Sequence, residues 1–291
     1  MKPSTQPAWT IRSLLAWMTQ DFQAAGIATP RLDAEILIAF ALGCDRVRVY
    51  LDLDRPLTPE ELVAVRALVV RRRKREPVAY IVGQREFYQR AFSVSPAVLI
   101  PRPDTETLIE RALELMPEDK PVHVLDLCTG SGAIAVTLAA ERPLAEVHAT
   151  DLSDAALSVA RDNAERHGVA ERIRFAQGDL FGALPERVLY DLIVANPPYI
   201  RAGDAPSLAP EIRLHEPELA LFAGEDGLAI IERLCVEVGG WLASGGTLLF
   251  EIGAGQAEGV MARMATLFEL TGVRAHRDLG GVLRVIEARR A

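Results

Sequence analysis

Cysteine and histidine are scarce in this chain. Its 291 residues include five scattered histidines and three cysteines, Cys44, Cys128 and Cys235. The cysteines lie far apart and show no metal-ligand spacing, so we expect neither a disulfide framework nor a metal site. Sparse, unpaired cysteine is typical of a protein of the reducing cytoplasm, which is the compartment that we expect.

Long apolar runs and an excess of positive charge are also missing. No stretch approaches the length of a membrane span, and Met1–Pro7 lacks the apolar core of a signal peptide, so no membrane association is expected. The formal net charge is −8. Because tight, non-specific binding of nucleic acid depends on neutralising phosphates, we do not expect such binding over the whole surface.

One short cluster of positive charge departs from this balance. It is Arg71-Arg72-Arg73-Lys74-Arg75. Two interpretations are open: a solvated helix end whose cations complement the helix dipole, or a docking patch for an acidic protein or for RNA. The first is favoured, because a run of like charge is usually a solvated face.

The chain is long enough for two domains, and its first part, residues 1–84, reads as short helices. Thr58-Pro59-Glu60-Glu61 has the pattern of a capping box with proline at the first helical position. Gly43 is a plausible helix stop. Apolar residues recur at helical spacing before it, and we expect them to form one face: Leu32, Ile36, Ala39 and Phe40.

A β-hairpin is expected to link this helical region to the rest of the chain. Over residues 85–100, two aromatic-rich segments flank a polar pair, Gln89-Arg90, which would form the turn. Next comes Pro103-Asp104-Thr105-Glu106, where Asp104 or Thr105 is placed to cap a helix.

From residue 101 to 291 strands and helices alternate, which indicates an α/β domain with a parallel sheet. A helix opened by Ser153 and another over about 255–270 lie between expected strands. Gly280-Gly281 would join the last two strands as an antiparallel hairpin. The expected strands are 122–127, 146–151, 173–177, 191–195, 247–252, 273–277 and 283–288.

A glycine loop follows the first strand of this sheet. Cys128-Thr129-Gly130-Ser131-Gly132 would let the backbone turn tightly and approach a ligand. Asp126 precedes the loop, either close to a cationic part of the ligand or as a structural carboxylate that caps the loop's N–H groups. Asp151 ends the next strand, where a carboxylate can accept hydrogen bonds from a ribose. Gly178-Asp179-Leu180-Phe181 ends the third strand and could hold an adenine ring.

The most informative segment is Asn196-Pro197-Pro198-Tyr199, which follows the apolar run 192–195. It would lie at the carboxyl edge of the sheet, where ligands bind in open α/β folds. The Asn196 side-chain oxygen and the Pro197 carbonyl would form a rigid pair of acceptors beside an aromatic ring. Such a cradle suits a planar –NH2 group, either of an amide or of a nucleobase.

The glycine loop alone fits a nicotinamide cofactor as well as S-adenosylmethionine. Two features favour S-adenosylmethionine. Asp126 lies where a carboxylate would approach a cationic methionine moiety rather than an anionic pyrophosphate. The cradle that begins at Asn196 also has no use in a dehydrogenase.

These residues resemble class I S-adenosylmethionine-dependent methyltransferases that modify a planar nitrogen. Further segments narrow the resemblance to the peptide chain release factor glutamine N5-methyltransferases (PrmC/HemK family). They are Pro77–Gly83, Leu99–Glu106, Glu216-Pro217 and Gly224–Leu228. The resemblance covers nearly the whole chain. It implies a Rossmann-like seven-stranded sheet with a terminal antiparallel hairpin, preceded by a small helical domain for substrate recognition.

The resemblance also implies an activity and the residues that carry it. The reaction would be methylation of the glutamine in the Gly-Gly-Gln motif of class 1 release factors, which modulates translation termination. The catalytic cradle falls on Asn196, Pro197, Pro198 and Tyr199. The cofactor contacts fall on Asp126, Cys128, Thr129, Gly130, Ser131, Gly132, Asp151, Asp179, Leu180, Phe181 and Asn196.

Other functions stay open at this point. The same cradle could hold a ribosomal-protein glutamine or a flipped adenine, although the acidic charge speaks against nucleic acid. A nicotinamide oxidoreductase and a catalytically idle binding module are further alternatives. We expect a monomer. No nucleophilic residue should be needed, because the sulfonium of S-adenosylmethionine is already a strong leaving group.

Overall fold

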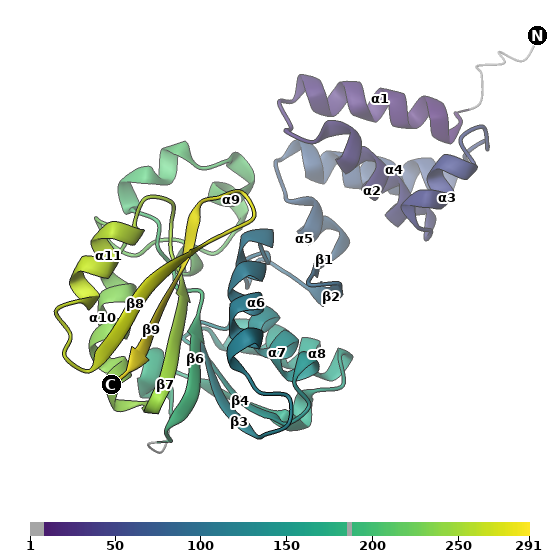
Figure 1. Ribbon diagram of the computed structural model, residues 1–291. Helices are drawn as coiled ribbons and strands as arrows, with labels where there is room; N and C mark the ends of the chain where they lie inside the picture. Colours follow the sequence, from purple (N-terminus) through teal and green to yellow (C-terminus); the bar gives the residue numbers. More distant parts are fainter. Residues whose placement is uncertain (1–8, 185–187) are drawn as a thin grey trace, which may run out of the picture. The chain divides into compact units, whose positions relative to one another are not determined.

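The computed structural model describes residues 9–184 and 188–291. Residues 1–8, with which the expected helical domain begins, lie outside this part. The chain divides into two compact units, one made of Met1–Gly83 with Ala209–His215, the other of Gln84–Leu208 with Glu216–Ala291 (Figure 1). A short segment from the second half of the chain therefore belongs to the helical unit. Over the described residues, no helix is long and apolar enough to cross a membrane.

The first unit is helical. The capping box at Thr58 is confirmed, since its hydroxyl accepts from the Glu61 N–H and the Glu61 carboxylate accepts from the Thr58 N–H. Gly43 ends a helix as expected, with φ +63°. The helices are α1 (Ile11–Ala24), α2 (Pro30–Leu42), α3 (Arg46–Leu51), α4 (Pro59–Arg73), α5 (Val78–Val82) and α9 (Pro210–His215).

The expected apolar face of α2 is wrong. Leu32 and Phe40 are exposed, whereas Leu37 and Ile38 are fully buried with Ala39 in the core of the unit. Apolar residues occupy more than one face of α2, so periodicity alone does not say which face is covered. Contacts with α1 and α4 select the face that carries Leu37 and Ile38.

The arginine run at the end of α4 is only partly a solvated helix end: Arg73 and Lys74 are exposed, but most of its side chains are paired. Arg72 is buried, and its guanidinium contacts the carboxylates of Asp33 at 2.7 Å and Glu211 at 2.8 Å. Three neighbours are paired as well: Arg71 with Glu76, Arg73 with Asp21 and Arg75 with Glu211. Arg72, Arg73 and Arg75 therefore hold this unit together through acidic residues that are distant in sequence, which argues against a free docking patch.

The second unit begins with the expected hairpin, β1 (Gln84–Phe87) and β2 (Arg90–Ser93). Its turn lies one residue earlier than expected, at Tyr88 and Gln89, which have φ of +45° and +59°. Positive φ at both central residues suits the right-handed twist of the two strands. The Tyr88 N–H donates to the Glu106 carboxylate at 3.0 Å, which stabilises this turn without glycine.

The rest of this unit is a seven-stranded sheet of order β5-β4-β3-β6-β7-β9-β8. The first five strands in this order are parallel, and β9 and β8 are antiparallel, which confirms the expected sheet and its terminal hairpin. The strands are β3 (Val122–Leu127), β4 (Ala145–Asp151), β5 (Ile173–Gln177), β6 (Tyr190–Ala195), β7 (Leu242–Glu251), β8 (Leu270–Arg277) and β9 (Leu283–Arg290).

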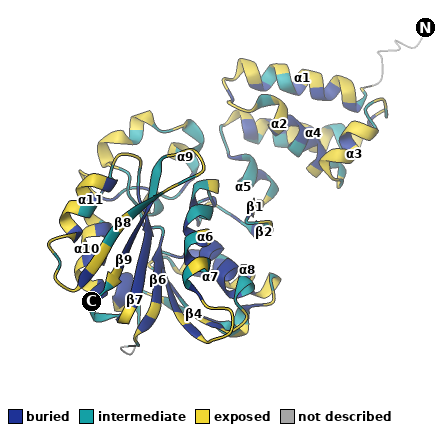
Figure 2. Cartoon of the chain, in the orientation of Figure 1, coloured by how far each residue is buried: buried dark blue, intermediate teal, exposed yellow. Residues whose placement is uncertain are grey.

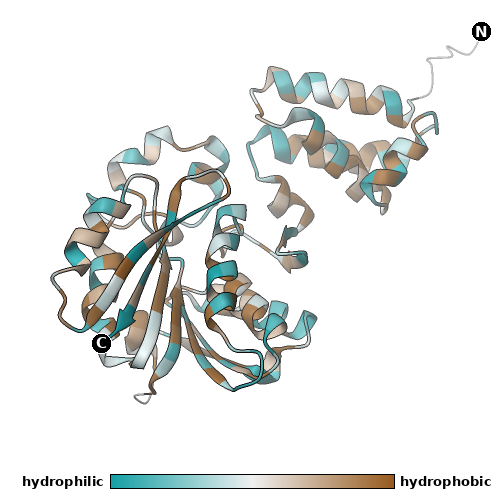
Figure 3. Cartoon of the chain, viewed as in Figure 1, coloured by the Kyte–Doolittle hydropathy of each residue, from teal (hydrophilic) through white to brown (hydrophobic). Residues whose placement is uncertain are grey.

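Helices cover both faces of this sheet (Figure 1). Helices α6 (Glu106–Leu115), α7 (Ala133–Glu141) and α8 (Asp154–Arg166) share one core with Val124 and Leu192. Helices α10 (Ala229–Glu237) and α11 (Ala257–Met264) share the other with Leu125 and Ile193. Strand β6 is buried and apolar in Figures 2 and 3, as expected for a central parallel strand.

Two helix predictions in this unit have different outcomes. Ser153 caps α8 through its hydroxyl, as expected. The helix expected over 255–270 ends at Met264, because Leu270 already starts β8 and is buried in the core. The order of the strands reverses between β3 and β6, so a crevice is expected outside their carboxyl ends.

Candidate active site

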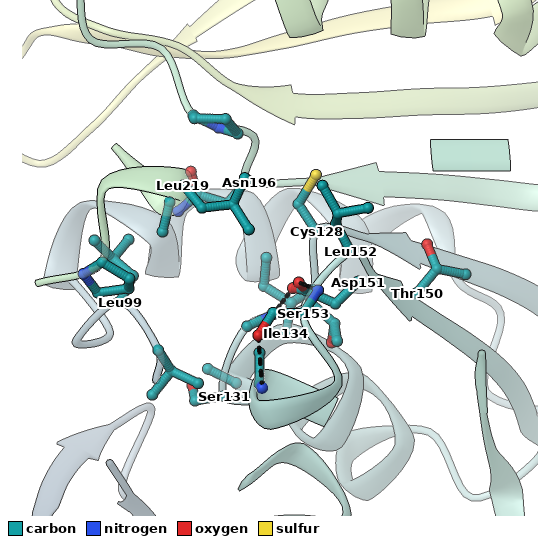
Figure 4. Close-up of a pocket in the computed structure, with 18 of the residues that line it drawn as sticks. Leu99, Cys128, Ser131, Ile134, Thr150, Asp151, Leu152, Ser153, Asn196 and Leu219 are labelled. Atoms are coloured by element: carbon teal, nitrogen blue, oxygen red, sulfur yellow. Dashed lines mark hydrogen bonds between the residues drawn. The ribbon is translucent and has the colours of Figure 1, made fainter. Parts of the chain in front are cut away.

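A pocket lies at this carboxyl edge, within the α/β unit. Figure 4 shows Cys128 after β3, Asp151 at the end of β4 and Asn196 after β6 around the same space. The parallel strands bring the three together although they are far apart in the sequence. Other expected site residues that line the pocket are Thr129, Gly130, Ser131, Asp179, Leu180 and Pro198. Expected site residues that do not line it are Asp126, Gly132, Phe181, Pro197 and Tyr199.

The glycine loop wraps the start of α7. Gly130 has φ +55°, and no atom lies within 4 Å of the position that a Cβ would take, so the glycine keeps space open. Gly132 has φ +78°, and a Cβ there would come within 3.1 Å of Ala160 on α8. Gly130 thus belongs to the pocket wall, whereas Gly132 serves the packing of the loop against a helix.

Asp126 lies beneath the loop rather than in the pocket. Its side chain is fully buried, and Oδ2 accepts hydrogen bonds from the Thr129 hydroxyl at 2.6 Å and the Ala135 N–H at 3.1 Å. Burial raises the pKa of Asp126 to about 7. Of the two roles left open by the sequence, the structure supports the structural one. A direct cofactor contact through this carboxylate has no support in the pocket lining.

Asp151 lines the pocket and is held rigidly. Its Oδ2 accepts from the Gly130 N–H and its Oδ1 from the Ser153 N–H, both at 2.9 Å. Burial raises the pKa of Asp151, while these backbone donors favour its charged form. Each carboxylate oxygen has lone pairs left, so Asp151 can accept further hydrogen bonds from a diol.

The two residues after β5 that were expected to contact adenine, Leu180 and Phe181, face different parts of the structure. Leu180 lines the pocket with φ +47°. Phe181 points into the core instead, where its ring stacks on Trp241 with centroids 5.4 Å apart. The prediction that Phe181 contacts the ring of a cofactor has no support, because the core face of the sheet takes this aromatic side chain. Asp179 also lines the pocket and pairs with Arg233.

The Asn-Pro-Pro-Tyr segment is fixed by hydrogen bonds to side chains of other segments. The Asn196 Nδ2 donates to the Thr105 Oγ1 at 3.2 Å. The Tyr199 hydroxyl donates to Glu251 at 2.9 Å, and its carbonyl accepts from the Gln256 Nε2. Tyr199 therefore anchors the end of the cradle, and the expectation that it packs on a substrate rests on no contact in the pocket.

Thr105 and Glu251 are site residues that sequence reasoning missed. Thr105 was expected as a helix cap, but its side chain makes no capping bond, and its hydroxyl donates to the Glu251 Oε2 at 2.6 Å. Glu251 ends β7 and is buried; burial raises its pKa, which the hydrogen bonds from Thr105 and Tyr199 oppose. A carboxylate at the end of an apolar strand was the available signal for Glu251.

One wall of the pocket comes from two segments that, in the sequence, showed only a resemblance to the release factor methyltransferases. The buried Glu216 carboxylate accepts from the Ile100 N–H at 3.2 Å and from Arg102 at 2.5 Å. This pairing joins Leu99–Arg102, which line the pocket in part, to Pro217 and Leu219 on the same lining. No local pattern reveals a contact between segments more than a hundred residues apart.

These residues fit S-adenosylmethionine. Asp151 offers a rigid acceptor for ribose hydroxyls, and the space at Gly130 stays open for close approach of a ligand. Apolar side chains of the lining, among them Ile134, Leu152 and Leu180, provide walls for an adenine ring. Within the described residues, no group of three or more His, Cys, Asp or Glu could hold a metal ion.

Solved structures of methyltransferases share this fold. A methyltransferase from Pyrococcus furiosus has a TM-score of 0.51 at 18% identity, with 68% of this chain and 87% of that chain covered. The catalytic domain of hMettl16 has a TM-score of 0.54 at 15% identity, with 67% and 74% covered. At these identities the likeness shows the fold alone, which is that of the class I S-adenosylmethionine-dependent methyltransferases.

Sequence comparison is more specific. A family model described as the PrmC N-terminal domain matches residues 13–83, and the methyltransferase small domain matches residues 105–214. The release factor glutamine methyltransferase of Geobacter sulfurreducens is 44% identical over 284 residues, 97% of each chain. That of Cereibacter sphaeroides is 47% identical over 266 residues, 91% of this chain and 93% of the relative. This chain belongs to the release factor glutamine methyltransferase family.

Proposed function

We propose that this protein transfers a methyl group from S-adenosylmethionine to the side-chain amide N5 of the glutamine in the Gly-Gly-Gln motif of class 1 release factors. The observation that carries the proposal is the shared pocket of Asn196 and Asp151, in a chain of this family. The acceptor proposed for an –NH2 group and the acceptor proposed for a ribose thus line one pocket, at the ends of two strands on either side of β3.

The chain's own residues position the substrate amide. An amide nitrogen is a poor nucleophile, because its lone pair is delocalised into the carbonyl. The Oδ1 of Asn196, a residue that lines the pocket, would accept one of its N–H bonds and so orient this lone pair toward the methyl donor. When bound, S-adenosylmethionine supplies the methyl group on a sulfonium sulfur, a strong leaving group.

The methyl transfer needs no further reactant. The N5–methyl bond would form as the methyl–sulfur bond breaks, the electron pair of that bond would stay on sulfur, and the nitrogen would release one proton after the transfer. The protein needs only to hold Asn196 rigidly and keep the pocket dry. Asp151 would hold the ribose, and the Leu180 side chain would pack against the adenine.

We also propose a role for the helical unit, the binding of the release factor. Large apolar side chains that are exposed on this unit support it: Trp9, Trp17, Phe40 and Tyr50. The protein would act as a monomer in the cytoplasm, where translation takes place, without tight binding of nucleic acid.

Tandem mass spectrometry of a purified class 1 release factor tests the main proposal. The factor is incubated with the protein and S-adenosylmethionine, and a single added methyl group is expected on the Gly-Gly-Gln glutamine. A release factor with alanine in place of this glutamine is the matched control and should stay unmodified. No modification, with cofactor binding confirmed by calorimetry, would contradict the proposal and point to a ribosomal-protein glutamine or to adenine.

A further inference from the structure

A chain of hydrogen bonds runs from the end of β7 to the substrate cradle. The Asn196 Nδ2 lies 3.2 Å from the Thr105 Oγ1, which lies 2.6 Å from the Glu251 Oε2. The other oxygen of Glu251 accepts from the Tyr199 hydroxyl at 2.9 Å. Thr105 and Glu251 are both buried. All four side chains belong to the same compact unit.

The number of protons that these hydrogen-bonded side chains can donate decides which way the Asn196 amide faces. A threonine hydroxyl has one proton, and Thr105 gives it to the Glu251 carboxylate. Towards Asn196 it can therefore only accept, so it binds the amide –NH2 and not the amide oxygen. The Oδ1 of Asn196 is left free of this contact.

We propose that Thr105 and Glu251 are positioning residues that hold the Asn196 carboxamide with its oxygen available to the substrate amide. The inference rests on the proposed function. Without the Thr105 hydroxyl the carboxamide could turn over and present its –NH2 to the –NH2 of the substrate glutamine. Two donors would then face each other, and the amide nitrogen would lose its orientation.

The sheet register supports this assignment. Ala195 of β6 pairs with Phe250 of β7, so the residues that follow, Asn196 and Glu251, lie at neighbouring strand ends. Thr105 lies in the turn that begins α6 and reaches both of them. Tyr199 donates to the second oxygen of Glu251, so the ionised carboxylate accepts at both ends, from Thr105 and from Tyr199.

Thr105→Val tests the inference, since valine keeps the volume of threonine and removes the hydroxyl. We expect kcat for methylation of the release factor to fall about tenfold to a hundredfold, because the variant loses the hydrogen bonds of the Thr105 hydroxyl to Asn196 and to Glu251. Thr105→Ser, which keeps the hydroxyl, should stay within about threefold of wild type. S-adenosylmethionine affinity should not change in either variant, because neither the ribose acceptor nor the loop is altered.

Thr137→Val is a matched control for the chemical change itself. Thr137 is a fully buried threonine of α7 whose hydroxyl has no hydrogen-bond partner among the described residues. Exchanging this hydroxyl for a methyl group should leave kcat and the Tm unchanged. If Thr105→Val lowers the Tm below the assay temperature, Thr105→Ala removes the same hydroxyl and replaces it in the test.

Binding separates positioning from a merely structural role. The affinity of each variant for the release factor is measured with S-adenosylhomocysteine bound, alongside the Tm and kcat. A fall in kcat with a binding affinity within about threefold of wild type, reversed in Thr105→Ser, supports positioning. An unchanged kcat in Thr105→Val, or equal losses in the serine and valine variants, would overturn it. Wild-type protein that methylates no release factor would instead refute the proposed function.

Discussion

Asp126→Asn should abolish a pH dependence of stability that the wild-type protein carries between about pH 4 and pH 7. The carboxyl group is fully buried; Oδ2 accepts both of its hydrogen bonds, and Oδ1 has no partner among the described residues. An asparagine amide oxygen at the Oδ2 position can accept the same two bonds from Thr129 and Ala135. The exchange therefore removes the titrating group with little change in shape.

The sign follows from the raised pKa. Burial raises the pKa of Asp126 from an ordinary 3.8 to about 7, so the folded protein keeps a proton that the unfolded chain has already lost. This contribution to stability is fully present below the ordinary pKa and is lost as the pH rises through about 7. The interval is about three pH units at about 1.4 kcal/mol each, which gives about 4 kcal/mol.

Urea denaturation of the protein without cofactor, from pH 4 to pH 8, measures this effect. The free energy of unfolding of the wild type should fall by about 4 kcal/mol relative to Asp126→Asn across this interval. Asp162→Asn, which removes an exposed carboxylate on α8, is the control and should follow the wild type. A constant difference between wild type and Asp126→Asn at every pH would refute the raised pKa and, with it, the account of this carboxyl group.

Three further substitutions test other parts of the structure. Asn196→Ala should lose most of its turnover while the calorimetric affinity for S-adenosylmethionine stays nearly intact; a large loss of cofactor affinity would contradict the role of Asn196. Asp151→Ala should do the reverse and weaken cofactor binding by about 1.5–3 kcal/mol, as for a charge-assisted hydrogen bond; an unchanged affinity would remove Asp151 from the site. Arg72→Met leaves the carboxylates of Asp33 and Glu211 without this cation. It should lower the free energy of unfolding by about 3–5 kcal/mol, whereas Arg66→Met, at an exposed position of the same helix, should change it little.

Much of the fold could be predicted because it depends on local patterns. Strands β3 and β5 match their expected bounds, since short apolar runs between polar turns predict buried strands. The capping residues Thr58 and Ser153 were predictable for the same reason, because each bonds within its own helix turn. Where an apolar helix has more than one candidate face, as α2 does, local pattern was not sufficient and the predicted face was wrong.

The candidate site was predictable only in part. The strand-end residues Asp151 and Asn196 were found, because parallel topology brings strand ends to one edge whatever the packing around them. The direction of Phe181 was not, because the packing of its ring on Trp241 decides it. A neighbouring position, Leu180, faces the pocket instead.

The sequence by itself determined the order of strands and helices, the glycine loop and the cradle that begins at Asn196, because neighbouring residues specify turns, caps and strands. Only the tertiary structure decided which way the Asn196 amide faces. That choice depends on Thr105, 91 residues earlier, whose proton goes to Glu251, 146 residues further along the chain than Thr105. A hydrogen bond takes its direction from the partner that folding brings to it, and no local pattern contains that partner.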